Sequence, residues 1–251
     1  MKKAIFLSIR NKAKRLPGKV LKDFSNGLNV TTFLISQLKK SKKADLILLA
    51  TSTNPDDIIL TNIAKENNIS FFCGSEDDKL LRYNKAAETF NIDAIAVVDG
   101  DDPFCSPEHI DNVFEALENE SCDYVTYDNL PLGASSFGVS FRALKKVCQD
   151  MPERDTEVWG HLFANHPDKY KVKFLKETNP LYTKPFVRLT LDYKEDYDFF
   201  VQVIQSLESK KLEINFHNLM LLLNENPSMV NINKSVQELY EHNIQKLKEA
   251  I

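Results

Sequence analysis

The chain has 251 residues, of which 43% are hydrophobic and 27% are charged, and its formal net charge at pH 7 is −4. These values are ordinary for a globular protein that buries a core. The acidic balance argues against general affinity for nucleic acid or an anionic membrane, and no run approaches the roughly 20 apolar residues of a membrane span.

The features that bear on location favour the cytoplasm. The first residues, MKKAIFLSIR, have a basic start, but their apolar run is shorter than the roughly 7–15 residues of a signal-peptide core, so we interpret it as a strand. The cysteines show no Cys-x-x-Cys or Cys/His metal spacing. We therefore expect reduced thiols at Cys73, Cys105, Cys122 and Cys148.

Strand and helix patterns alternate through the first half of the chain. Short apolar runs predict strands that are buried on both faces, and the segments between them have helical periodicity. This alternation indicates βαβ units and a mainly parallel sheet. The predicted strands are Ala4–Ile9, Leu46–Ala50, Ile69–Phe72 and Ala94–Val98, and the predicted helices are Val30–Ser41, Pro55–Asn67, Asp77–Phe90 and Pro107–Leu117.

The pattern changes after about Cys122. Two strands are expected on either side of the turn Pro131–Gly133, and the tail from Tyr193 is expected to be mostly helical, with a break at Asn226–Pro227. We find no internal repeat or long Gly/Ser linker, so we expect residues 1–251 to form one domain. The strands expected here are Tyr124–Tyr127, Ser136–Phe141, Val172–Leu175 and Phe186–Leu191, and the helices are Phe141–Asp150, Glu157–Asn165 and Ser235–Ala250.

Three polar segments directly follow predicted strands. They are the basic run RNKAKRLPGK at Arg10–Lys19, the segment TSTNPDD at Thr51–Asp57 and the acidic turn DGDDP at Asp99–Pro103. In open α/β sheets, ligands bind at the carboxyl ends of the strands. We therefore expect the three segments to surround one crevice.

The basic run has the chemistry of a phosphate site. Guanidinium and ammonium groups neutralise phosphate oxygens, and main-chain N–H groups in a tight turn add donors. Gly18 allows close approach of the backbone and Pro17 stiffens the turn. The run lacks the glycine spacing of a P-loop or a dinucleotide site, and a solvated loop is the alternative interpretation.

The acidic turn has the chemistry of a cation site. Asp99, Asp101 and Asp102 lie within one turn, and clustered carboxylates repel one another unless a cation or hydrogen-bond donors compensate. Mg²⁺ is commonly held by one or two carboxylates together with phosphate oxygens. The alternative is that these acids favour the start of the next helix. A basic loop and an acidic turn at the same edge of the sheet favour a metal–nucleotide site.

Five segments, in chain order, resemble the motifs of one enzyme family. They are RNKAKRLPGK, ATSTNPDD (Ala50–Asp57), GSEDDKLLRY (Gly74–Tyr83), GDDP (Gly100–Pro103) and RLTLDYKED (Arg188–Asp196). The ordered set resembles the bacterial cytidylyltransferases related to the CMP-Kdo and CMP-sialic acid synthetases, most closely the spore-coat-polysaccharide type. The resemblance implies an α/β, Rossmann-like nucleotidyltransferase fold of the GT-A kind. Its mostly parallel central sheet would be flanked by helices, and a small α+β insertion at about residues 125–185 would contact the acceptor and mediate dimerisation.

The resemblance also implies a reaction. CMP would pass from CTP to a sugar, sugar acid or related small-molecule acceptor, pyrophosphate would leave, and Mg²⁺ would be the cofactor of a homodimeric enzyme in surface polysaccharide or glycoconjugate synthesis. Arg15, Lys19 and Asp101 would be catalytic, and Asp101 and Asp192 would bind the metal. The implied nucleotide contacts are Leu7, Ser8, Ile9, Arg10, Arg15, Lys19, Ala50, Gly74, Ser75, Asp78, Arg82 and Asp99, with main-chain groups near Leu7–Ile9 and Ala50 reading the cytosine edge.

The expected acceptor region departs most from the family pattern. Phe137 lies where an acid is common, and in RDTEVWGHLF (Arg154–Phe163) His161 follows several residues after the position of the usual Glu-His pair. His161 and His166 are either acceptor contacts or surface residues, and Trp159 either stacks on the acceptor or packs in the core. The alternatives to a sugar-type acceptor are a phosphorylated alcohol or phosphonate, another pyrimidine base, or a nucleotide-binding regulatory protein without turnover.

Overall fold

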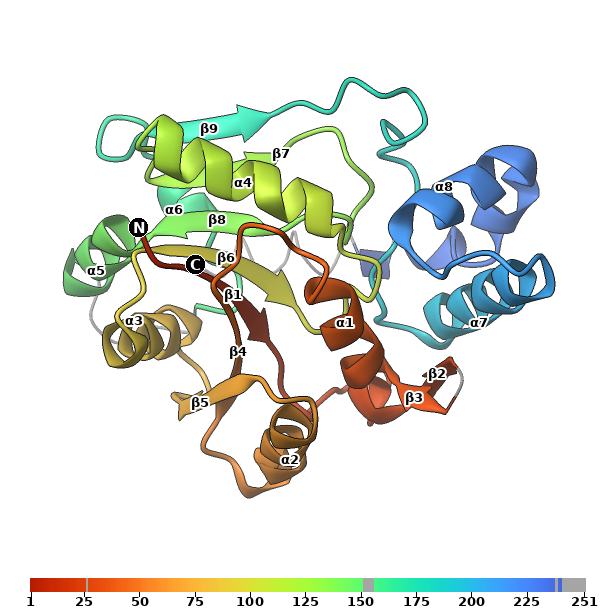
Figure 1. The fold of residues 1–251 in the computed structure, drawn as a ribbon, viewed down its shortest axis with the longest axis horizontal. Helices are drawn as coiled ribbons and strands as arrows, with labels where there is room; N and C mark the ends of the chain where they lie inside the picture. Colours follow the sequence, from red (N-terminus) through yellow and green to blue (C-terminus); the bar gives the residue numbers. More distant parts are fainter. Residues whose placement is uncertain (26, 151–155, 238, 241–251) are drawn as a thin grey trace.

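The structure is a computed structural model that describes residues 1–25, 27–150, 156–237 and 239–240. At its centre is a seven-stranded sheet with the strand order β5-β4-β1-β6-β8-β7-β9 (Figure 1). Its strands are β1 (Lys3–Ser8), β4 (Leu46–Ser52), β5 (Ser70–Gly74), β6 (Ala94–Asp99), β7 (Tyr124–Tyr127), β8 (Phe137–Ser140) and β9 (Val172–Leu175). Two short strands, β2 (Asp23–Ser25) and β3 (Leu28–Asn29), form a separate antiparallel ribbon.

The predicted α/β fold with a mainly parallel sheet is confirmed. β1 pairs in parallel with β4 and β6, and β4 pairs in parallel with β5. β8 is antiparallel to both of its neighbours, whereas β7 and β9 are parallel. Residues 4–7 of the central strand β1 have no exposed surface, which explains why this strand is apolar on both faces.

Helices cover both faces of the sheet. α1 (Val30–Leu38), α2 (Ile58–Glu66) and α4 (Pro107–Asn119) pack on the face that contains Ile5 and Leu7. α3 (Lys79–Phe90), α5 (Phe141–Asp150) and α6 (His161–Ala164) pack on the face that contains Phe6. The described ranges also contain three short 3₁₀ helices, η1 (Lys19–Leu21), η2 (Pro55–Asp57) and η3 (Pro227–Asn231).

A third hydrophobic cluster lies to one side of the sheet. Here α7 (Lys194–Ser209) and α8 (Phe216–Glu225), which lie beside the sheet in Figure 1, pack with Phe24, Phe33 and Phe104 in one hydrophobic cluster. The break expected at Asn226–Pro227 is confirmed, because α8 ends at Glu225 and Pro227 begins η3. This cluster holds the segment before α7 against the carboxyl ends of the strands.

Two predicted elements differ from the structure. Phe186–Leu191 is not a strand, because its only bridge to another described residue is the isolated one from Arg188 to Leu132, while Val187, Leu189 and Leu191 pack into the third cluster. The helix predicted at Glu157–Asn165 shortens to His161–Ala164, and the segment before it is held by Trp159 in the core. Most of the helix predicted at Ser235–Ala250 lies outside the described residues.

Two further expectations from the sequence concern the cysteine thiols and the lack of a membrane span. All four cysteines are free. Within the described ranges, no helix is both long enough and apolar enough to cross a membrane.

Candidate functional site

The basic loop after β1 folds back toward the sheet. Gly18 has φ 65, in the left-handed region that glycine adopts at little cost, and it begins the 3₁₀ turn η1. Within the turn, the Lys19 N–H donates to the Leu16 carbonyl at 3.1 Å. The Lys19 side chain is thereby directed inward and is only 12% exposed. The loop is therefore not simply a solvated loop.

Asp57 ties this loop to the end of β4. Its buried carboxylate accepts hydrogen bonds from the Asn11 N–H at 2.7 Å and from the Thr51 and Ser52 hydroxyls at 2.9 and 2.6 Å. The segment TSTNPDD thus adjoins the basic loop, as predicted.

The acidic turn packs tightly against the end of β1. A Cβ at Gly100 would come within 2.6 Å of the Ile9 side chain, so only glycine fits there without a shift. The Gly100 N–H donates to the Ser8 carbonyl at 2.8 Å. On the other side, the Leu191 N–H donates to the Asp101 carbonyl at 2.7 Å. This last bond places Asp192 beside the acidic turn.

The basic loop and two distant aspartates converge on one point. Lys19 Nζ lies 2.6 Å from Asp101 Oδ2 and 3.0 Å from Asp192 Oδ1. Arg15 Nη2 lies 2.6 Å from the same Asp192 oxygen, and its guanidinium carbon lies 5.1 Å from the centre of the Tyr193 ring. The four residues that the sequence assigned to catalysis and metal binding are thus in one cluster.

The charges of this cluster are strongly coupled. Burial would raise the pKa of Asp101, but the Lys19 ammonium outweighs burial and holds that pKa below its ordinary value. Burial would likewise lower the pKa of Lys19, but Asp101 and Asp192 hold it above its ordinary value. Lys19 and Asp101 are therefore both charged at neutral pH, and the Lys19 ammonium forms ion pairs with two carboxylates.

A buried network of hydrogen bonds and ion pairs holds the Asp192 side chain and backbone in position. Arg188 Nη2 donates to Asp192 Oδ2 at 3.0 Å, and Arg188 Nε donates to Asp196 Oδ1 at 2.9 Å. Asp196 also accepts from the Asp192 N–H, and Asn233 Nδ2 donates to Asp196 at 3.0 Å. The motif RLTLDYKED contains all of these groups except Asn233, which has no sequence signal because it lies outside any motif.

The two carboxylates fit a divalent cation that arrives with phosphate. An ammonium already lies between Asp101 and Asp192, so the site favours positive charge. Among the described residues, no group of three or more His, Cys, Asp or Glu side chains could hold a metal alone. Mg²⁺ needs only one or two carboxylates when phosphate oxygens complete its octahedron.

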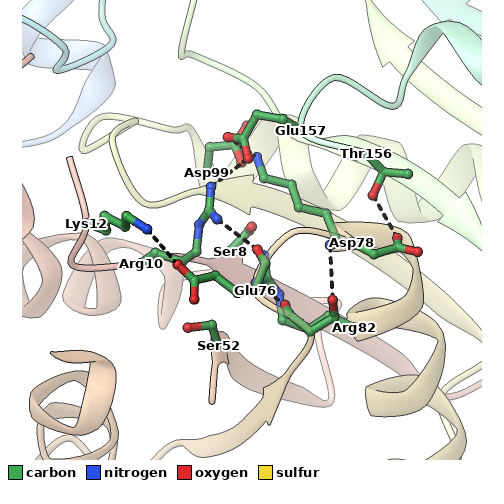
Figure 2. Close-up of polar contacts among 12 residues, drawn as sticks. Ser8, Arg10, Lys12, Ser52, Glu76, Asp78, Arg82, Asp99, Thr156 and Glu157 are labelled. Carbon is green, nitrogen blue, oxygen red and sulfur yellow. Dashed lines mark hydrogen bonds and ion pairs between the residues drawn. The ribbon is translucent and has the colours of Figure 1, made fainter. Parts of the chain in front are cut away.

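A second set of charged residues lies beside the first. Arg10 Nη2 is 2.6 Å from Glu157 Oε2, and Arg10 Nη1 donates to the Glu76 carbonyl at 2.8 Å (Figure 2). Lys79 Nζ lies 3.3 Å from Glu157 and 3.5 Å from Asp99. Arg10 and Asp99 were predicted nucleotide contacts, whereas Lys79 and Glu157 were missed, because neither occupies a defined position of its motif.

The GSEDDKLLRY segment forms a turn and the start of α3. Arg82 Nη1 donates to the Ser75 carbonyl at 2.9 Å, while Arg82 Nε and Nη2 are buried and have no hydrogen-bond partner among the residues that the structure describes. Gly74 lies against the Arg82 side chain. Asp78 caps α3 by accepting from the Leu81 N–H, and the Thr156 hydroxyl donates to it. Arg82 therefore has donors available, whereas the Asp78 carboxylate is already engaged.

The other predicted nucleotide contacts lie at the ends of the central strands. Leu7 and Ala50 are fully buried within the sheet, so only their main-chain atoms could face a ligand. The Ile9 N–H donates to the Ala50 carbonyl at 3.2 Å, and the Ser8 hydroxyl accepts from Tyr83 at 2.5 Å.

In the expected acceptor region, Trp159 is a core residue. It is 4% exposed and lies between the rings of Tyr83, Tyr124, Phe137 and Phe163, with centroid distances of 5.7–6.1 Å. The packing alternative therefore holds for Trp159. Phe137, which replaces the acid common in the family, is one of these packing partners.

The comparisons agree with the geometry. A family model described as Cytidylyltransferase matches residues 4–225. The spore coat polysaccharide biosynthesis protein SpsF of Bacillus subtilis is 30% identical over 227 residues, which cover 88% of this chain and 93% of that protein. An uncharacterized protein of Methanocaldococcus jannaschii is 31% identical over 235 residues, 92% of this chain and 94% of that protein.

Solved structures show the same fold. A cytidylyltransferase from Leptospira borgpetersenii is 27% identical, with a TM-score of 0.79 over 92% of this chain and 97% of that one. The CMP:2-keto-3-deoxy-manno-octonic acid synthetase, solved with CTP, is 13% identical, with a TM-score of 0.58 over 84% of this chain and 100% of that one. The second likeness shows the nucleotidyltransferase fold alone.

Proposed function

The chain belongs to the cytidylyltransferase family, and from this premise we propose that it transfers CMP from CTP to the hydroxyl of a sugar, sugar acid or related acceptor. The product would serve surface polysaccharide or glycoconjugate synthesis, as the name of the Bacillus subtilis relative suggests. The observation that carries the proposal is the convergence of Arg15 and Lys19 on Asp101 and Asp192.

The proposed chemistry is a displacement at phosphorus. The acceptor oxygen forms a bond to the α-phosphorus of CTP, the bond from that phosphorus to the bridging oxygen breaks, and pyrophosphate leaves. The hydroxyl proton passes to water. Such transfers depend mainly on positioning and on stabilising charge. Arg15 and Lys19 would neutralise the leaving pyrophosphate, and the tight turn at Gly18 would hold both cations at the carboxyl end of β1.

Mg²⁺ belongs to this proposal as the cofactor. Asp101 and Asp192 would hold it together with triphosphate oxygens, and the ion would supply charge neutralisation at the reacting phosphates. The Arg188–Asp196 network would keep Asp192 oriented while the contacts of Lys19 change. Lys19 would then be available to the phosphates.

The Arg82 side chain is evidence for a nucleotide-binding site next to the GSEDD turn. Its Nε and Nη2 groups are buried donors that find no acceptor in the described part of the chain, and such groups are costly unless a ligand or water satisfies them. Carbonyl or hydroxyl oxygens of the nucleotide base or ribose have the required chemistry.

The test is pyrophosphate release from CTP and Mg²⁺ across a small acceptor panel. The panel contains 2-keto-3-deoxy-manno-octonic acid, neutral sugars and a phosphorylated alcohol, with ATP, GTP and UTP as nucleotide controls. We expect release with CTP and with one acceptor class. Tight CTP binding without release from any acceptor would favour the regulatory alternative, and equal release from all four nucleotides would contradict the assignment of the base.

A further inference from the structure

Three separate segments bring a carboxylate between two cations at the edge of the site. Arg10 comes from the loop after β1, Lys79 from the first turn of α3, and Glu157 from the segment before α6. Glu157 Oε2 lies 2.6 Å from Arg10 Nη2 (Figure 2). Glu157 Oε1 lies 3.3 Å from Lys79 Nζ. Each carboxylate oxygen therefore faces a different cation.

Both cations are fixed by groups other than Glu157. The second terminal nitrogen of Arg10 donates to the Glu76 carbonyl, and Lys79 also lies beside Asp99. Their side chains are 21% and 11% exposed, whereas that of Glu157 is 43% exposed. Glu157 is thus the most exposed member of the group. The two cations are less exposed, and their other partners hold them in position.

The backbone next to Glu157 is docked on α3. The Thr156 hydroxyl accepts from the Leu80 N–H at 3.1 Å and donates to Asp78 Oδ1 at 2.8 Å. Thr156 is 6% exposed, so it anchors the segment, while the long side chain of Glu157 can rotate away without moving the anchor.

Glu157 carries a negative charge, as a substrate phosphate or carboxylate does. Burial would raise the pKa of Glu157, but Lys79 and Arg10 outweigh it and hold that pKa below its ordinary value. The group between the cations is therefore an anion at neutral pH. The pair lies next to Asp99, at the end of β6, where the acidic turn of the proposed site begins.

We propose that Arg10 and Lys79 form an anion subsite of the proposed nucleotidyl-transfer site, and that the Glu157 carboxylate occupies it until a substrate phosphate or carboxylate replaces it. The inference rests on the proposed function. Glu157 is the exposed member of these ion pairs, and water screens it more than it screens the two cations, so a multiply charged phosphate, or a carboxylate positioned by the rest of its molecule, can exchange with it. The subsite adds Lys79 to the residues that bind substrate.

The test is isothermal titration calorimetry on the full chain with CTP, inorganic pyrophosphate and 2-keto-3-deoxy-manno-octonic acid. It compares the wild type, Glu157→Gln and the control Glu115→Gln, which removes the same charge from α4, where Glu115 forms an exposed pair with Lys43 of the loop before β4. In Glu157→Gln we expect about two- to fivefold tighter binding of the anion that uses the subsite, the range for an exposed ion pair. Glu115→Gln should leave every affinity unchanged.

The three probes identify the occupant. A gain with CTP and pyrophosphate assigns the subsite to nucleotide phosphate, and a gain with the sugar acid alone assigns it to the acceptor. In a Lys79→Gln background the gain should shrink, because both substitutions act on one subsite. A gain that stays complete in that background removes Lys79 from the subsite.

If Glu157→Gln binds every probe no more tightly than the wild type, the inference is wrong. Failure of the wild type to bind CTP would contradict the proposed function instead, so the two failures can be told apart.

Discussion

At the scale of single residues, the site is built from charges that hold one another in place. Lys19 lies between Asp101 and Asp192, where the proposed mechanism places a divalent ion, so the ammonium compensates two carboxylates that would otherwise repel each other. Glu157 compensates Arg10 and Lys79 in the same way. The charges of these two groups thus compensate one another within the protein, and we propose that bound substrate exchanges with these partners.

Asp101→Asn removes a carboxylate charge and keeps the shape of the side chain. Because Asp101 would hold the metal, we expect pyrophosphate release to fall by about a hundredfold or more, the cost of losing one preorganised charge contact in a transfer reaction. Thermal unfolding should show a folded protein, since the side chain is 26% exposed. Activity at the wild-type level would remove Asp101 from the metal site.

Lys19→Ala removes the cation shared by the two carboxylates. We expect CTP binding or transfer to weaken by about 1.5–3 kcal/mol, the range for a charge-assisted contact. Calorimetric titration with CTP and a steady-state assay together measure the change. Unchanged affinity together with an unchanged rate would show that the loop does not hold the triphosphate.

The residue scale also shows what the sequence could predict. Arg15, Lys19, Asp101 and Asp192 were identified because each belongs to a short motif with defined spacing. Lys79 and Glu157 were not, since their pairing joins residues 78 positions apart in the chain and depends on how Thr156 docks on α3. No local sequence pattern predicts a contact between residues so far apart in the chain.

At the scale of elements, the start of α7 supports the site. Arg188 is 2% exposed at its side chain, and the Asp192 and Asp196 carboxylates hold its guanidinium. Asp196 also accepts from the N–H groups of Asp192 and Tyr193, the two residues directly before α7, so it fixes the chain where the helix begins. The metal-binding aspartate of the proposal thus depends on a helix start.

Asp196→Ala should therefore destabilise the fold strongly. The substitution leaves Arg188 buried beside a single carboxylate, and we expect a loss of about 3–5 kcal/mol in the free energy of unfolding. Urea unfolding measures it. Asp198→Ala is the matched control, because it removes an exposed pair with Lys194 on the same helix and should cost less than about 1 kcal/mol. Equal losses in the two variants would contradict the role of the network.

A second contact between elements joins α4 to the loop after β9, through His109 and Glu177. Glu177 accepts from the Thr178 and Asn179 N–H groups at 2.7 Å and lies 2.8 Å from His109 Nε2. Burial would raise the pKa of Glu177, but these donors outweigh burial and hold it below its ordinary value. The carboxylate therefore stabilises the fold above the ordinary Glu pKa of about 4.3, and this stability is lost as the pH falls through the lowered pKa.

Glu177→Gln should accordingly lose stability at neutral pH, by about 1–3 kcal/mol for the donors left without their carboxylate. The difference from the wild type should narrow below about pH 4, where the wild-type carboxyl also becomes neutral. Urea unfolding at both pH values measures it. A difference that stays constant with pH would show that the charge of Glu177 is not what stabilises the loop.

At the scale of the whole molecule, the sheet brings the three polar segments together. β1 lies between β4 and β6, so its carboxyl end adjoins both the segment after β4 and the acidic turn. Apolar runs predicted this parallel part well, because strands buried on both faces leave a clear signal. Phe186–Leu191 was mispredicted because its alternating apolar residues pack against α7 and α8 rather than against a sheet.

In the proposed site, Asp101 and Asp192 hold one divalent ion together with the triphosphate of CTP. A crystal structure with CTP and Mn²⁺, in which anomalous scattering locates the ion, tests this claim most directly. We expect the ion between the two carboxylates, with triphosphate oxygens completing its coordination and with Arg15 and Lys19 bound to the phosphates. An ion and triphosphate bound away from both aspartates would contradict it.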